Sequence, residues 1–294
     1  MKKAMVFGCN GYLGRNMCWY LQQQGWTVTG ADIQPSGFQN GFEYYRIDVA
    51  DASSVAQIDL ATFELIFFFS GLTGTWNGFE QADTYLRINE LGLLHFIRQY
   101  QQQQAKGRIV FPSTRLVYKG IANTPLKETD ELLPLTPYAV NKIACEHYLA
   151  AFKKAWGIHY TVFRLCIPYG NLTDATSSYG TIGFFESMAA KGQPISLYGD
   201  GQLKRTFSHM LDIVTAMLQA ATMDETDGEI YNLGGETYSL LEVAELVAKK
   251  YGSTVAFAEW PAQAAIIESG DTIFDSTKIE ALGIRTTKLL KENL

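Results

Sequence analysis

Ala4-Met5-Val6-Phe7-Gly8-Cys9-Asn10-Gly11-Tyr12-Leu13-Gly14 is the segment that most constrains the architecture of this chain. Its first four residues form an apolar run typical of a short buried strand, and a helical pattern extends from Tyr12 to Gln24, before Gly25. We therefore expect a strand, a glycine turn and a helix. Glycines in such a turn allow backbone N–H groups to approach a pyrophosphate, although a plain tight turn would use the same residues. The spacing Gly-x-x-Gly-x-x-Gly is a variant of the dinucleotide-binding fingerprint.

A carboxylate follows the next predicted strand. Trp26 to Ala31 has the pattern of a strand, and Asp32 ends it, 18 residues after Gly14. A carboxylate at this place can accept hydrogen bonds from both ribose hydroxyls of an adenosine and repels a 2′-phosphate. No lysine or arginine occurs from residue 33 to residue 43. The sequence therefore predicts NAD rather than NADP.

Strands and helices alternate over the first 165 residues or so, with connections long enough for parallel pairing. We expect further strands at 44–47, 65–69, 108–111 and 158–165, and a helix from Pro137 to about Trp156. The pattern predicts an α/β protein with a doubly wound parallel sheet of the Rossmann type. Beyond residue 168 a smaller, mixed α/β C-terminal lobe is expected to bind substrate, with a helical tail from Asp275. The predicted NAD-binding domain comprises 1–168 and about 205–235, and the substrate lobe about 169–204 and 236–294.

Small polar residues follow two of these strands. The apolar run 65–69 leads into Ser70-Gly71-Leu72-Thr73, and the run 108–111 leads into Pro112-Ser113-Thr114. In open parallel sheets, ligands bind at the carboxyl ends of the strands. An isolated threonine at such a place could equally be a buried hydroxyl satisfied by the backbone.

Pro137-Tyr138-Ala139-Val140-Asn141-Lys142 opens the longest predicted helix. Proline suits the first helical turn, and Tyr138 and Lys142 then lie one turn apart on the same face. A neighbouring ammonium favours the phenolate and lowers the pKa of a tyrosine towards neutrality, so the phenol can act as acid or base. With 16 tyrosines in the chain, this spacing alone could arise by chance.

The composition limits the possible partners. The chain has 294 residues, 47% of them hydrophobic and 18% charged, with a formal net charge of −6. An acidic chain is unsuited to nucleic acid or an anionic membrane surface, and the longest apolar run is far shorter than a membrane span. Four cysteines without a Cys-x-x-Cys pair predict a reducing cytoplasm, and four scattered histidines predict no metal site.

Taken together, these segments resemble the extended short-chain dehydrogenases/reductases, specifically the NAD-dependent nucleotide-sugar epimerase/dehydratase family. The resemblance covers nearly the whole chain, and it depends on the order and spacing of the motifs rather than on any one of them. The matching positions are Gly8-x-x-Gly11-x-x-Gly14, Asp32, Asp48-Val49, Asn89-x-x-Gly92, Ser113-Thr114 before Tyr118, Tyr138-x-x-x-Lys142, Arg164 to Gly170, Tyr198-Gly199-Asp200-Gly201, Arg205, Asp212 and Tyr231-Asn232-Leu233-Gly234.

The resemblance implies a catalytic triad, a cofactor site, a substrate site and a homodimer formed by the helices around Leu94 and Tyr148. The implied catalytic residues are Thr114, Tyr138 and Lys142. The implied NAD contacts are Gly8, Asn10, Gly11, Tyr12, Leu13, Gly14, Asp32, Asp48, Val49, Ser70, Gly71, Leu72, Asn89, Tyr138, Lys142 and Ile167. The implied substrate contacts are Thr73, Thr114, Arg115, Tyr138, Phe185, Tyr198, Arg205 and Phe207.

The implied reaction is 4-epimerisation of a nucleotide sugar, with UDP-hexose as the expected substrate. Thr114 would hydrogen-bond the reacting hydroxyl, and Tyr138 would remove its proton as hydride passes to NAD⁺. The resulting 4-keto sugar would turn over before hydride returns. Two other functions stay open: a nucleotide-sugar 4-keto reductase that exchanges NAD(P)H, and a catalytically silent NAD-binding sensor or scaffold.

Three positions depart from the family pattern. The dehydratases carry Asp-Glu directly after the threonine, whereas this chain has Arg115-Leu116, which disfavours dehydration. A second arginine common near the carboxyl-terminal aspartate is missing from Ile267-Glu268-Ser269-Gly270-Asp271, so Arg205 would be the main clamp on a pyrophosphate. Arg115 is expected either at the sugar site or on the surface.

Overall fold

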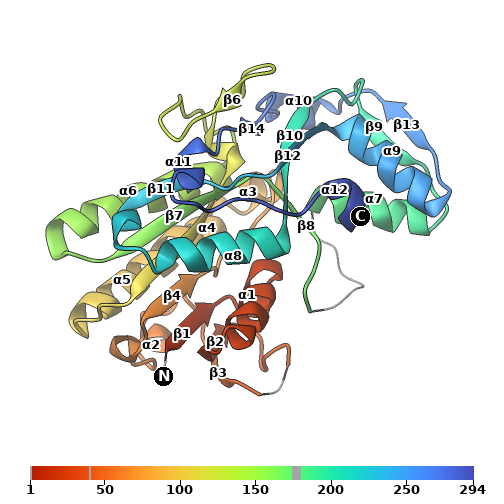
Figure 1. The fold of residues 1–294 in the computed structure, drawn as a ribbon. Coiled ribbons are helices and arrows are strands. Elements are labelled where there is room, and N and C mark those ends of the chain that lie inside the picture. The colour runs from red at the N-terminus through yellow and green to blue at the C-terminus, as the bar shows by residue number, and fades with distance from the viewer. Residues whose placement is uncertain (1, 40, 174–179) are drawn as a thin grey trace.

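A computed structural model describes residues 2–39, 41–173 and 180–294 of the chain. Its centre is a seven-stranded parallel sheet in the order β11-β7-β5-β4-β1-β2-β3 (Figure 1). β1 lies between β2 and β4, so the direction of winding changes at the carboxyl end of β1, where doubly wound sheets bind ligands. The strands are β1 (Lys3–Phe7), β2 (Thr27–Asp32), β3 (Glu43–Arg46), β4 (Leu65–Phe68), β5 (Arg108–Thr114), β7 (Tyr160–Leu165) and β11 (Glu229–Asn232).

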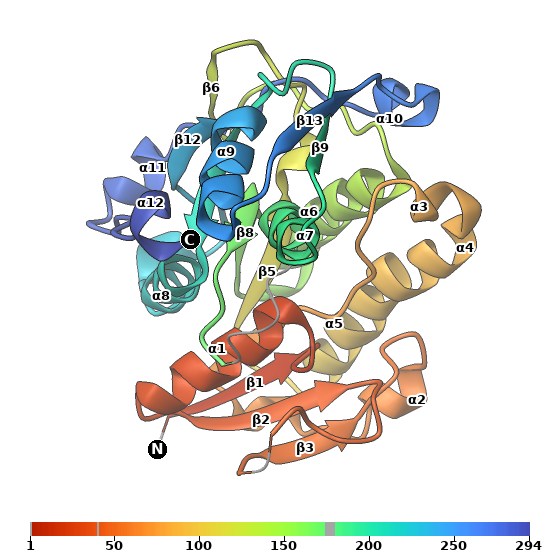
Figure 2. The same ribbon diagram turned by 90° about the vertical axis from the view of Figure 1, so that its right-hand side faces the viewer.

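Helices cover both faces of the sheet (Figure 2). One face packs against α1 (Tyr12–Gln23) and α8 (Met210–Ala221), and the other against α2 (Ala52–Val55), α5 (Gly92–Gln102) and α6 (Pro137–Trp156). Successive residues of β1 enter opposite layers: Ala4 and Val6 belong to the first core, Met5 and Phe7 to the second. A strand buried on both sides is apolar throughout, which explains the continuous run in the sequence.

A smaller lobe lies beside the sheet and has its own apolar core. It contains the three-stranded sheet β12-β10-β8, the two-stranded sheet β13-β9 and the packed helices α7 and α9. Their bounds are β8 (Ile167–Tyr169), α7 (Gly180–Ala190), β9 (Ile195–Tyr198), β10 (Lys204–His209), β12 (Glu236–Ser239), α9 (Leu240–Tyr251) and β13 (Val255–Ala258). Two short strands, β6 (Pro125–Leu126) and β14 (Ile273–Phe274), pair with each other. The short helices are α3 (Asn77–Glu80), α4 (Ala82–Tyr85), α10 (Ala262–Ile266), α11 (Thr277–Glu280) and α12 (Leu290–Asn293). The segment η2 (Leu86–Leu91) is π-helical, and η1 (Leu60–Thr62), η3 (Arg115–Val117) and η4 (Asp224–Thr226) are 3-10 turns.

The structure confirms the doubly wound α/β sheet and refines its edges. β5 continues to Thr114, so this residue belongs to the strand rather than to the loop after it. β10 pairs with β12 and β8 instead of the central sheet, whereas α8 and β11 return to the central sheet. Residues 174–179 of the expected substrate lobe lie outside the described residues.

The predicted helical tail is wrong. After Asp275 only two four-residue helices, α11 and α12, occur in the described chain. The segment between them is held by the Asp212 carboxylate, which accepts hydrogen bonds from the backbone N–H groups of Thr287 (3.0 Å) and Lys288 (2.8 Å). A side chain distant in the sequence satisfies these N–H groups, so they need no helical partner.

Gly14 gives a test of the close packing between the glycine turn and α1. A Cβ at Gly14 would lie 2.0 Å from the backbone oxygen of Gly8. We expect Gly14→Ala to lower the free energy of unfolding by about 3 kcal/mol or more, because rigid backbone must move. Gly25→Ala is the control: it has a positive φ of +75° but nothing within 4 Å of the added atom, so a loss of about 1 kcal/mol is expected. Equal losses in urea titrations of the two variants would contradict the steric explanation.

Candidate active site

A cavity of about 380 Å³ opens at the carboxyl edge of the central sheet. It collects residues from the ends of β1, β4, β5 and β7, together with the start of α1 and the first turns of α6. Its lining is Gly8, Gly11, Tyr12, Leu13, Gly14, Phe69, Gly71, Leu72, Thr73, Pro112, Ser113, Thr114, Tyr138, Lys142, Leu165, Cys166 and Pro168. The structure thus brings the predicted triad and most of the predicted glycine turn into one cavity.

The glycine turn has the geometry of a pyrophosphate cradle. Gly8 has a φ of +74°, and a Cβ there would lie 2.8 Å from the backbone of Phe69 and Ser70. The N-cap of α1 is Gly11, which offers no side chain to the N–H groups of the first helical turn. Those N–H groups and the positive end of the helix are suited to an anion. The turn therefore fits the pyrophosphate of a dinucleotide.

Asp32 lies at the rim of this turn. Its Oδ2 accepts a hydrogen bond from the Asn10 backbone N–H (3.1 Å), and its Oδ1 accepts one from Gln34 N–H (3.2 Å). The carboxylate is therefore fixed beside the turn, as a ribose ligand should be. Two arginines from other segments also reach this rim: Arg15 Nη2 donates to Asn10 O (2.8 Å) and Arg46 Nε to Ile33 O (3.3 Å). Both arginines lie outside residues 33–43, the segment whose lack of lysine and arginine predicted NAD rather than NADP.

Tyr138 and Lys142 share one face of α6, whose start is well specified. The Thr136 hydroxyl caps the helix by accepting a hydrogen bond from Ala139 N–H (3.2 Å), and Pro137 occupies the first turn. The Lys142 Nζ lies 5.8 Å from the centre of the Tyr138 ring and donates to the backbone oxygen of Pro112 (2.7 Å). The ammonium is therefore tied to β5, the strand that also carries Thr114.

Lys142 is only 7% exposed. Burial lowers the pKa of Lys142 to about 8, and the negative charge of Glu146 opposes part of this effect. At pH 7 the side chain remains mainly an ammonium. It can therefore favour the phenolate form of the neighbouring tyrosine.

A buried ion pair joins the elements that carry the triad. Arg164 of β7 donates to both carboxylate oxygens of Glu146 on α6, from Nη2 (2.6 Å) and from Nε (3.1 Å). The Ser113 hydroxyl of β5 also donates to Glu146, and Arg164 Nη1 donates to the Tyr118 hydroxyl (2.7 Å). Both charged side chains are less than 5% exposed. Glu146 was not among the residues predicted from the sequence, although its position one turn after Lys142 is a usable signal.

Asn89 hydrogen-bonds the backbone of Leu72, a residue of the cavity lining. Its Oδ1 accepts a hydrogen bond from Leu72 N–H (2.7 Å), and its Nδ2 donates to Leu72 O (3.1 Å). The residue lies in the π-helical segment η2, a geometry often found at functional sites. Asn89 therefore fixes the loop after β4, which lines the cavity, rather than lining it itself.

Several predicted site residues lie outside the cavity lining. Phe185 and Phe207 are buried in the core of the smaller lobe, and Tyr198 is half exposed. The Asp48 carboxylate accepts a hydrogen bond from the backbone N–H of Ala50 (2.9 Å). Asn10, Asp32, Val49, Ser70, Asn89, Arg115, Ile167 and Arg205 are likewise absent from the lining. Ligand contacts for all of these residues stay predictions.

Two arginines and one glutamate lie behind the cavity wall near Cys166. Arg205 of β10 donates to Glu268 (2.6 Å), which belongs to the segment 267–271, where the expected second arginine is missing. Arg115 follows Thr114 directly and reaches Ser269 and Thr272. The Arg115 side chain is partly buried. The cluster is therefore part of the protein interior next to the site.

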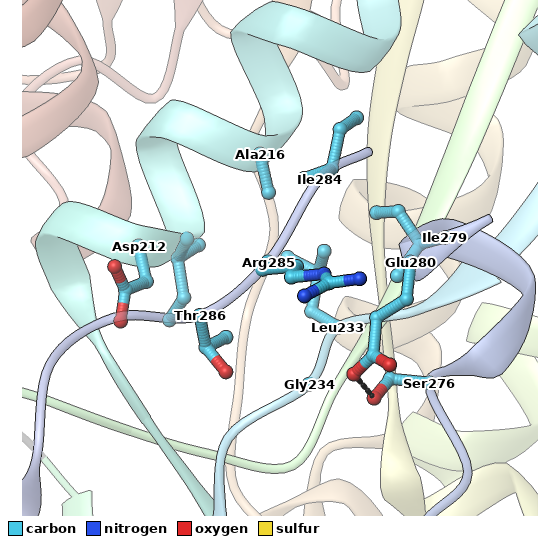
Figure 3. A pocket seen from close by; sticks show the side chains of 11 residues that line it. Asp212, Ala216, Leu233, Gly234, Ser276, Ile279, Glu280, Ile284, Arg285 and Thr286 are labelled. Atoms are coloured by element: carbon cyan, nitrogen blue, oxygen red, sulfur yellow. Dashed lines mark hydrogen bonds between the residues drawn. The ribbon is translucent and has the colours of Figure 1, made fainter. Parts of the chain in front are cut away.

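A second hollow lies between α8 and the C-terminal segment (Figure 3). It is lined by Asp212, Leu233, Ile279 and Arg285 among others, and Ser276 donates a hydrogen bond to Glu280 at its edge (2.7 Å). Its volume of about 10 Å³ has room for at most one water molecule. This hollow is too small to bind a nucleotide.

Within residues 2–39, 41–173 and 180–294, no group of three or more His, Cys, Asp or Glu side chains is arranged to hold a metal ion. None of the described helices is both long and apolar enough to cross a bilayer.

The fold and the cavity define a dinucleotide-binding protein of the doubly wound α/β class. The model of the NAD dependent epimerase/dehydratase family matches residues 4–234, and this chain belongs to that family. It is therefore an NAD-dependent enzyme, and the glycine turn with Asp32 at its rim fits that cofactor.

Three similar proteins illustrate the relationship. A putative UDP-glucose 4-epimerase of Methanocaldococcus jannaschii is 25% identical over 99% of this chain and 95% of its own length. A UDP-glucose 4-epimerase of Halalkalibacterium halodurans is 26% identical over 91% of this chain and 84% of its own length. The crystal structure of Thermus thermophilus UDP-glucose 4-epimerase in complex with NAD superposes with a TM-score of 0.87, at 24% identity, over 99% of this chain and 96% of that one.

Glu146→Gln tests the buried ion pair. The substitution keeps the volume of the side chain but leaves the Arg164 charge buried without a counter-charge, so we expect the free energy of unfolding to fall by about 3 kcal/mol or more. Glu131→Gln is the control, because it removes the same charge from an exposed pair. The side chains of Lys119 and Glu131 are 49% and 65% exposed, so the free energy of unfolding should fall by less than about 1 kcal/mol. Similar losses in the two variants would show that Glu146 and Arg164 contribute no more than a surface pair.

Lys142→Met tests the burial of the ammonium through the pH dependence of stability. Because the pKa of Lys142 is about 8 in the folded protein against the ordinary 10.5, the unfolded chain binds more protons between these pH values. Wild-type stability should therefore gain roughly 3 kcal/mol from this group as the pH rises from 8 to 10.5. Lys142→Met lacks this gain, so its stability relative to wild type should fall by that amount over the range. A constant difference between Lys142→Met and wild type over this range would place the Lys142 ammonium in solvent.

Proposed function

We propose that this chain is an NAD-dependent nucleotide-sugar 4-epimerase that acts through a transient 4-keto sugar, with a UDP-hexose as substrate. The observation that carries the proposal is the meeting of Thr114, Tyr138 and Lys142 with the glycine turn in one cavity. The names of the two curated relatives support the same substrate class. A homodimer formed through α5 and α6, and residence in the cytoplasm, belong to this proposal.

Each residue of the triad has a distinct task. Thr114 at the end of β5 holds the reacting hydroxyl of the sugar by a hydrogen bond. The Tyr138 phenolate removes the proton of that hydroxyl and later returns it, and the Lys142 ammonium keeps the phenolate accessible near neutral pH. The glycine turn and Asp32 would hold NAD, which would supply reversible hydride transfer at the sugar carbon. Inversion follows if the keto sugar turns over between the two transfers.

Two alternatives use the same fold. A nucleotide-sugar 4-keto reductase would employ the same triad but exchange NAD(P)H in every turnover. A silent sensor or scaffold would bind NAD without reaction. Arg115 and Leu116 lack the carboxylates that dehydration requires, which argues against a dehydratase. The cofactor content of the purified protein separates the first two functions: retained NAD supports the epimerase, and an empty site that oxidises added NAD(P)H with a 4-keto sugar supports the reductase.

Tyr138→Phe is the decisive variant for the mechanism. It removes the acid–base group but keeps the ring, so epimerisation of UDP-galactose should slow by about 10²- to 10⁴-fold while the amount of bound NAD stays unchanged. Tyr251→Phe, which removes the hydroxyl of a tyrosine on α9, should retain wild-type activity. Retention of full activity by Tyr138→Phe would exclude Tyr138 from the mechanism, and the absence of reaction with every nucleotide sugar would favour the silent alternative.

A further inference from the structure

Two arginines lie at the rim that carries Asp32, the expected ligand of the adenosine ribose. Arg15 Nη2 donates to the backbone oxygen of Asn10 (2.8 Å). Arg46 Nε donates to the backbone oxygen of Ile33 (3.3 Å). These bonds leave both positive charges in place, and an arginine near the ribose favours the 2′-phosphate of NADP. The chain nevertheless belongs to an NAD-dependent family, so another feature of the rim must act against NADP.

Asn10, in the glycine turn, bonds the rim through its backbone and its side chain. Its backbone N–H donates to Asp32 Oδ2 (3.1 Å). Its side chain spans to the loop after β2: Nδ2 donates to Ser36 O (2.8 Å), and Oδ1 accepts from Phe38 N–H (2.8 Å). An amide group has both a donor and an acceptor, so it can pair with a backbone segment at two points. The side chain of Asn10 therefore connects the glycine turn to the loop 33–38.

The orientation of Asp32 depends on these same two segments. The turn binds Oδ2 through Asn10 N–H, and the loop binds Oδ1 through Gln34 N–H (3.2 Å). On the far side of the loop, the Tyr44 hydroxyl donates to the backbone oxygens of Asp32 and Gln34. A carboxylate oxygen bound once still has a lone pair for a ribose hydroxyl. The carboxylate keeps its direction as long as the turn and the loop keep their separation, which the Asn10 side chain fixes.

We propose that Asn10 determines the preference of this chain for NAD over NADP, and that its side chain acts through Asp32 rather than by contact with the cofactor. Held between the turn and the loop, the carboxylate accepts hydrogen bonds from the ribose hydroxyls and repels a 2′-phosphate. A ligand group that is fixed in advance also binds more tightly, because no order is lost on binding. Without the amide, Asp32 can turn away, and the charges of Arg15 and Arg46 then favour the phosphate.

Competition between the two cofactors provides the test, since NAD and NADP differ only in the 2′-phosphate. The full chain is equilibrated with mixtures of NAD and NADP, and the bound cofactors are extracted and quantified. Wild type should prefer NAD by about 100-fold or more, as expected for hydrogen bonds to a charged group together with repulsion of the phosphate. Asn10→Ala should reduce this preference by about 10-fold. Asn10→Ser, whose hydroxyl can make at most one of the two bonds, should fall between them.

Asn16→Ala is the matched control. Asn16 also joins two segments through its amide, which donates to Tyr12 O (2.7 Å) and accepts from Leu172 N–H (2.6 Å). None of these bonds involves Asp32, so the preference for NAD should stay unchanged. In an Asp32→Ala background, Asn10→Ala should alter the remaining preference by less than about twofold, because no carboxylate is left to orient.

Four outcomes would overturn the proposal. They are a wild type without preference, an unchanged preference in Asn10→Ala, an equal loss in Asn16→Ala, and a further loss when Asn10→Ala is added to Asp32→Ala. The last outcome would mean that Asn10 contacts the cofactor itself. If Asn10→Ala does not fold, the preference of Asn10→Ser decides. The mixtures contain no nucleotide sugar, so the result does not depend on the epimerase proposed above.

Discussion

The buried pair of Glu146 and Arg164 is the interaction on which the arrangement of the site depends. It connects α6, which carries Tyr138 and Lys142, to β7, and through Ser113 to β5, which carries Thr114. A charged pair in the interior is favourable only when hydrogen bonds satisfy its remaining donors and acceptors. Here the donors come from the same strands that position the triad, so a displaced helix would break several charge-assisted bonds at once. The relative positions of Thr114 and Tyr138 are therefore held by electrostatics as well as by packing.

Lys142 shows how burial and function oppose each other in this chain. An ammonium in an apolar layer weakens the folded state, because the charge loses its hydration. The same burial leaves its field poorly screened, so that it acts strongly on the nearby phenol. The ammonium donates to the backbone oxygen of Pro112, and its Nζ lies 4.4 Å from the centre of the Phe111 ring. Burial lowers the pKa of Lys142 to about 8, with the charge of Glu146 acting in the opposite direction, so the ammonium is still mainly protonated at neutral pH. Burial of Lys142 therefore weakens the folded state and, with Nζ 5.8 Å from the centre of the Tyr138 ring, strengthens the electrostatic effect on the phenol.

The central sheet and α6 could be predicted because the sequence patterns that specify them are local. The errors arose where contacts between residues distant in the sequence decide the structure. The bounds of α6 agree with the structure because Pro137 marks its start and Gly157, in the left-handed conformation, caps its end. The glycine turn was equally readable, since its constraints act within a few residues. In contrast, the tail after Asp275 is shaped by Asp212, and Arg205 meets Glu268 across 63 positions of the chain. Such contacts leave no periodic signal in the sequence.

The availability of an arginine to a ligand depends on its partners more than on its place in a motif. By sequence, Arg205 matches a family position and Arg115 is an irregularity. In the structure, Arg205 donates to one carboxylate and two backbone oxygens, whereas Arg115 reaches only two distant hydroxyl groups. Glu268 therefore engages the guanidinium of Arg205 in a charge-assisted hydrogen bond, which makes Arg205 less available to an anion.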